Sequence, residues 1–99
     1  MVIIARNEDL TLLYNRAKKK YHECINYQEN KFLQNEIGVP LRSIQLVETD
    51  VKIVFSQESA DTYLLEICLT LYTDNKSIGK YVYTENEMGK GVDDSLVFY

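Results

Sequence analysis

The amino-acid sequence predicts an α+β fold in which an N-terminal amphipathic helix packs on an antiparallel meander of four or five strands. Before residue 38, apolar residues recur at three- and four-residue spacing, which is the period of a helix. After Pro40 they alternate with polar residues, which is the period of a strand. A helix with one apolar stripe and a sheet with one apolar face each need a partner, so we expect one to pack on the other.

The helix is expected to begin at Asn7, whose side chain is a favourable cap. Glu8 and Asp9 follow in the first turn, where carboxylates interact well with the positive end of the helix dipole. The stripe that faces the sheet is then made of seven residues: Leu10, Leu13, Tyr14, Ala17, Tyr21, Cys24 and Ile25.

Two observations bear on where the helix ends: the sequence pattern and the length that a single straight helix would have. Phe32 continues the stripe, and Gly38 with Pro40 is a stop signal. A straight helix from Glu8 to Glu36 would measure about 40 Å, which is long for so small a domain. We therefore expect the helix to be bent or broken near residues 26–31.

The strands are expected at residues 42–48, 51–57, 62–73, 77–85 and 92–99, each bounded by polar turn residues. The first two flank Thr49 and Asp50, so they are either two strands or one. In the longest segment the odd-numbered side chains share one face, which is apolar enough to be the core face: Tyr63, Leu65, Ile67, Leu69 and Leu71.

Length, composition and charge indicate one acidic globular domain over residues 1–99. The net charge of −4 is uneven, at +1 for residues 1–38 and −5 for residues 39–99. An acidic surface repels a phosphate backbone, so direct nucleic-acid binding is disfavoured. The basic run from Arg16 to Lys20 is better explained as a solvated helical face.

Neither an export signal nor a segment long enough to span a bilayer is recognisable, so we expect a cytoplasmic protein without membrane contact. In that compartment Cys24 and Cys68 would remain thiols. His22 is the only histidine and lies on a different side of the helix from Cys24, so a zinc site is not expected. A nucleophilic pair of His22 and Cys68 is the weaker alternative to a surface histidine.

The segment "ENEMGKGVDD" at residues 85–94 carries two glycines that suit a hairpin connection with positive φ at Gly89 and Gly91. It lacks the following helix that a phosphate loop requires. Asp93 and Asp94 are neighbours in a strand and point to opposite faces, so they do not form one metal site. We expect Asp94 at the margin of the core and Asp93 exposed; no metal, cofactor or catalytic residue is predicted.

Tyrosine is the unusual feature of the composition, with eight copies and no tryptophan. Its large ring and polar tip suit protein interfaces, although any one ring can equally cover the core. The tyrosines in and after the last two predicted strands lie close in sequence to acidic residues. Six residues therefore form the predicted partner-binding surface: Tyr81, Tyr83, Glu85, Glu87, Asp93 and Tyr99.

The last third, "IGKYVYTENEMGKGVDDSLVFY", resembles the closing strands of small immunity proteins from bacterial toxin–immunity systems. A helix followed by a meander also looks like a cystatin-like or NTF2-like arrangement, in which a curved sheet wraps a helix. With the acidic charge, the resemblance implies an inhibitor, not an enzyme, that covers the basic cleft of a nuclease-type toxin or of another nucleic-acid enzyme.

Two other functions fit the same sequence. One is a ligand-binding protein or enzyme of the NTF2-like or cystatin-like kind, with a pocket between helix and sheet where Asp94 or Glu66 does acid–base work. The other is a homodimer that pairs through sheet edges or faces.

Overall fold

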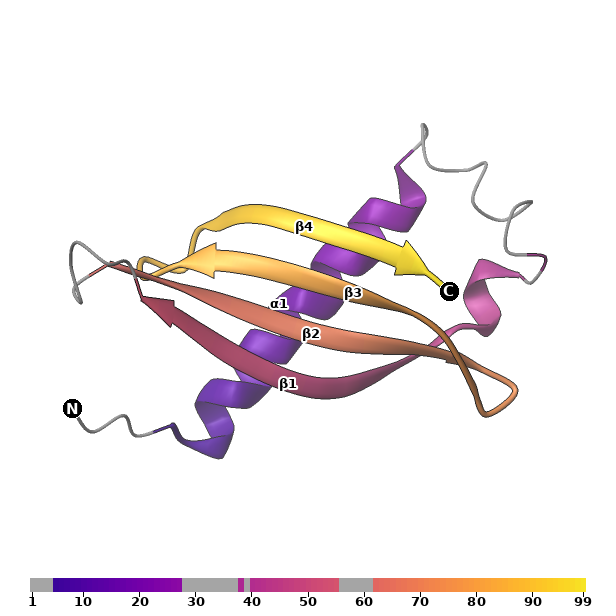
Figure 1. Cartoon of the computed structure of the whole chain (residues 1–99), viewed down its shortest axis with the longest axis horizontal. Helices are drawn as coiled ribbons and strands as arrows, with labels where there is room; N and C mark the ends of the chain where they lie inside the picture. Colours follow the sequence, from indigo (N-terminus) through magenta and orange to yellow (C-terminus); the bar gives the residue numbers. More distant parts are fainter. Residues whose placement is uncertain (1–4, 28–37, 39, 56–61) are drawn as a thin grey trace.

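The computed structural model describes residues 5–27, 38, 40–55 and 62–99, and it contains one helix lying across one face of a four-stranded antiparallel sheet (Figure 1). The strands follow one another as a meander, in the order β1-β2-β3-β4. The predicted α+β fold is therefore confirmed, with four strands. In chain order the elements are α1 (Asn7–Asn26), the 3-10 turn η2 (Leu41–Ser43), β1 (Gln45–Phe55), β2 (Tyr63–Thr73), β3 (Lys76–Asn86) and β4 (Gly91–Phe98).

Helix α1 begins where the sequence predicts, but its cap is different. Arg6 is the capping residue, no side chain caps the first turn, and Asn7 is already helical. The Arg6 guanidinium instead donates to the Asp9 carboxylate at 3.1 and 3.3 Å. The predicted Asn7 cap is therefore wrong, while the two acids do occupy the first turn.

The helix ends at Asn26, at the start of the segment where its length predicted an interruption. Tyr27 follows in an extended conformation, and its N–H donates to the Cys24 carbonyl at 3.3 Å. The predicted continuation of the stripe at Phe32 lies outside the described residues. The buried part of the stripe is Ala17, Tyr21 and Ile25.

One strand replaces the two that were predicted around Thr49 and Asp50. The pairing of β1 with β2 shifts register between Glu48 and Asp50, and the Thr49 and Thr70 hydroxyls share a hydrogen bond across the strands. A β-bulge adds one residue to a strand without ending its pairing, so the polar dipeptide did not become a turn.

The predicted core face of β2 is confirmed. Ile67, Leu69 and Leu71 are fully buried and face the helix, which also packs on β1 and β3. The small Ala17 side chain, also fully buried, lies in this core. The core comprises Ala17, Tyr21, Ile25, Ile67, Leu69, Leu71, Tyr81 and Tyr83.

The two cysteines lie on opposite sides of the sheet. Cys24 is on the helix, whereas Cys68 alternates with buried Ile67 and Leu69 and so points to the other face. Both are half-buried thiols, as predicted, and burial raises the pKa of each. The sheet also separates Cys68 from the exposed His22, so the alternative nucleophilic pair is not formed.

Candidate functional site

The predicted surface tyrosines of β3 are core residues. Tyr81 pairs with Leu69 and Tyr83 with Ile67, and residues directly opposite in a sheet share a face. Tyr81 is accordingly fully buried and Tyr83 is 4 % exposed. The prediction that these two rings form an exposed surface is therefore wrong.

A register shift explains why these rings point inward. The β2–β3 hairpin closes with Asp74 and Asn75 at positive φ, and its first pairs are Thr73 with Lys76 and Tyr72 with Ser77. An unbroken register would place Lys80 opposite Leu69. The shift between Leu71 and Tyr72 places Tyr81 there instead, and a one-residue shift turns a whole strand over.

Glu85 is also buried, at 1 % exposure, and is fixed by the helix. The Arg16 guanidinium donates twice to its carboxylate, at 3.0 and 2.6 Å. This hydrogen-bonded pairing raises the pKa of Arg16. Glu85 therefore ties α1 to β3 and does not belong to the acidic surface that the sequence predicts.

Asp94 lies at the margin of the core, as predicted. Its carboxylate accepts a hydrogen bond from the buried Tyr81 hydroxyl at 2.8 Å. Burial first, and then this carboxylate, raise the pKa of Tyr81. Asp93 pairs with Thr84 and is exposed on the face away from the helix.

The glycines of the β3–β4 connection form a hairpin turn. Gly89 has a φ of +78°, and the Asn86 side chain accepts from the backbone N–H groups of Met88 and Lys90, both at 3.0 Å. Positive φ is thus confirmed at Gly89. It is wrong at Gly91, which begins β4 so close to Tyr83 that an added Cβ would lie 2.8 Å from the Tyr83 hydroxyl.

Three of the six predicted binding residues remain exposed: Glu87, Asp93 and Tyr99. Glu87 and Asp93 lie at the hairpin end of the sheet. Tyr99, which is 76 % exposed, follows the other end of β4, roughly 25 Å away along an eight-residue strand. The structure therefore places both acids toward one end of the sheet and the tyrosine toward the other.

Two open cavities flank Glu87 at this end of the sheet. One, of about 340 Å³, lies between the first half of α1 and the ends of β2 and β3; the other, of about 290 Å³, lies over the ends of β1 and β2. Glu87 lines both. Neither Asp94 nor Glu66 lines these two cavities, so the alternative pocket around those carboxylates stays a prediction.

Large apolar side chains surround Glu87. Leu12 is 57 % exposed, Phe55 39 % and Met88 83 %. The helix crosses the strands obliquely, so it does not cover the whole sheet (Figure 1). We call these four residues the hairpin-end surface: Leu12, Phe55, Glu87 and Met88.

The sequence contained a signal for part of this surface. Leu12 is apolar but out of phase with the helical stripe, which indicates an exposed leucine. Phe55 gave no such signal, because the sequence does not show how far the helix extends over the sheet. Its ring centroid lies 6.0 Å from that of Tyr63, the residue it pairs with on β2.

Searches of protein-family models, curated proteins and solved structures found no match to this chain. Within the described residues, no three His, Cys, Asp or Glu side chains gather into a metal-binding cluster. In the same part of the chain no helix is long and apolar enough to cross a membrane.

Proposed function

We propose that this protein is an immunity-like inhibitor that acts in the cytoplasm by binding a basic nuclease-type toxin or another nucleic-acid enzyme through the hairpin-end surface. The observation that carries the proposal is the position of Glu87, which separates two open cavities and is flanked by exposed Leu12, Phe55 and Met88. Interfaces commonly combine an apolar centre with polar groups at its rim.

The charges at this end favour a basic partner. Glu87 and Asp93 form no ion pair with any described residue, whereas on α1 Lys18 pairs with Glu48 and Lys20 with Glu23. An unpaired acidic rim speeds association with a positive cleft and repels acidic competitors. The Glu87 and Asp93 carboxylates are therefore open to a basic partner, with one exposed lysine, Lys90, between them in the chain.

The apolar residues suit an anchoring role. Aromatic rings contribute large contact areas at interfaces, and methionine adapts its shape to a partner. Phe55 and Met88 take the role that the sequence analysis assigned to Tyr81 and Tyr83, which are buried.

Binding to purified basic nuclease-toxin domains, followed by biolayer interferometry and nuclease inhibition, tests the proposal. Glu87→Lys should lower the association rate on the order of tenfold, because it reverses a rim charge. Glu23→Lys makes the same charge change on the distant half of the helix and should bind like the wild type.

Two results would contradict the proposal. One is that no domain of the panel binds. The other is that a bound domain has the same affinity for Glu87→Lys, for Met88→Ser and for the unmodified protein.

A further inference from the structure

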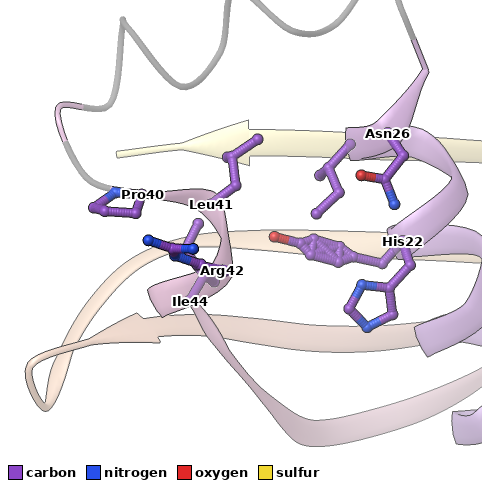
Figure 2. Close-up of a pocket in the computed structure, with 8 residues that line it drawn as sticks. His22, Asn26, Pro40, Leu41, Arg42 and Ile44 are labelled. Atoms are coloured by element: carbon purple, nitrogen blue, oxygen red, sulfur yellow. The ribbon is translucent and has the colours of Figure 1, made fainter.

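A third cavity, of about 680 Å³, lies at the other end of α1, between its last turns and η2 (Figure 2). This volume is within the range of small-molecule sites in proteins. Its lining comes from two segments that are distant in sequence: Tyr21, His22, Ile25 and Asn26 on the helix, and Pro40, Leu41, Arg42 and Ile44 opposite.

Tyr21, one of the lining residues, carries an unusual hydroxyl group. Tyr21 is 1 % exposed, yet its oxygen is buried without a hydrogen-bond partner among the described residues. Buried polar groups in proteins are nearly always hydrogen-bonded, so an exception needs an explanation. The neighbouring Tyr81 obeys the rule, because its hydroxyl donates to Asp94.

The Tyr21 ring is held in place by its neighbours. Its centroid lies 5.6 Å from that of Tyr81 and 5.4 Å from that of His22. Burial raises the pKa of Tyr21 to about 12, so the hydroxyl keeps its proton at neutral pH. It is therefore a fixed donor that requires an acceptor atom.

The other lining residues indicate which chemical groups a ligand would carry besides the acceptor for Tyr21. Ile25, Leu41 and Ile44 are apolar and at least half-buried, which suits a hydrocarbon body. The exposed rim carries His22, Asn26 and Arg42, while no carboxylate lines the cavity among the described residues. Figure 2 shows His22 and Asn26 on the helix and Arg42 on the opposite segment.

We propose that this cavity binds a small organic acid with an apolar body, whose inner carbonyl oxygen accepts a hydrogen bond from Tyr21 and whose carboxylate pairs with Arg42. The inner group is a neutral acceptor because a buried charge without a counter-ion is costly. The carboxylate lies at the rim, where a guanidinium can bind it in a bidentate manner. This site is separate from the hairpin-end surface and does not depend on the function proposed for it.

Isothermal titration of the full chain with 4-oxopentanoate, 5-oxohexanoate and 6-oxoheptanoate tests the proposal, because the series samples different separations between carbonyl and carboxylate. The unsubstituted pentanoate, hexanoate and heptanoate are the matched controls. We expect at least one oxo acid to bind on the order of fivefold more tightly than its control, since only the oxo acid pairs with the hydroxyl.

Two variants assign that preference to named groups. Tyr21→Phe should abolish the difference between the oxo acid and its control, with an unchanged circular dichroism spectrum showing that it folds. Arg42→Gln should weaken both acids alike, by roughly three- to tenfold, while the exposed Arg6→Gln leaves both unchanged.

The proposal is overturned if no acid saturates the protein at millimolar concentration. It is equally overturned if the oxo-acid preference survives in Tyr21→Phe, or if Arg42→Gln and Arg6→Gln have the same effect.

Discussion

Glu85 on β3 and Tyr21 on α1 are both buried polar residues between helix and sheet, but only one of them has a hydrogen-bond partner. Glu85 accepts two hydrogen bonds from Arg16, whereas the Tyr21 hydroxyl has no partner among the described residues. An unpaired buried carboxylate costs several kcal/mol, on the order of 3–5, whereas an unpaired hydroxyl costs about 1–3. The buried Glu85 carboxylate therefore needs a partner within the folded chain. The smaller cost of an unpaired hydroxyl allows Tyr21 to remain without one until a ligand binds.

The largest expected effect comes from removing the partner of the charge. Arg16→Met leaves Glu85 buried and unpaired, so the free energy of unfolding should fall by about 3 kcal/mol. This value is at the lower end for buried pairs because Arg16 is itself 45 % exposed. Urea denaturation at neutral pH measures it.

The chain offers a matched control for this change. Lys18 forms an ion pair with Glu48 from the same helix to the same sheet, but both partners are substantially exposed. Lys18→Met should therefore cost less than about 1 kcal/mol. Equal losses of stability in the two variants would show that burial of Glu85 does not make its ion pair more important. The same conclusion would follow if adding Glu85→Met to Arg16→Met did not restore stability.

A smaller effect is expected from Tyr21 in alkaline solution. Its pKa is raised from 10 to about 12 in the folded state, so its contribution to stability is complete below pH 10 and is lost as the pH rises to 12. Tyr21→Phe cannot ionise, and near pH 12 it should retain about 2 kcal/mol that the wild type loses.

Urea denaturation of both proteins across this range, with the absorbance titration of tyrosine as a second readout, measures the difference. Parallel loss of stability in the two proteins would show that the Tyr21 hydroxyl is not shielded from solvent.

The sequence was sufficient for those features that depend on periodicity. The three- and four-residue stripe predicted the buried Ala17, Tyr21 and Ile25, and alternation in the longest strand predicted the core face of β2. The helix length predicted an interruption close to Asn26, where α1 ends. These properties follow from local geometry, so no knowledge of neighbouring strands was needed.

Features that depend on register were not predictable. Alternation shows that Tyr81, Tyr83 and Glu85 share a face, but the shift after the Asp74–Asn75 turn decides which face that is. The same limit applies to the bulge at Thr49, which joins two predicted strands.

The cavity at Tyr21 was not predictable either, because it lies between helix and η2 residues that are distant in sequence. Among the six predicted binding residues, Glu87 is the one that is both exposed and part of the lining of a cavity described here.

The most direct test of the contrast between satisfied and open polar groups is the pair of unfolding free energies for Tyr81→Phe and Tyr21→Phe, without added ligand. Tyr81→Phe removes a hydrogen bond to a carboxylate and should lose about 1 kcal/mol, whereas Tyr21→Phe removes an unpartnered hydroxyl and should gain about 1–3 kcal/mol. A loss in Tyr21→Phe as large as that in Tyr81→Phe would contradict the account.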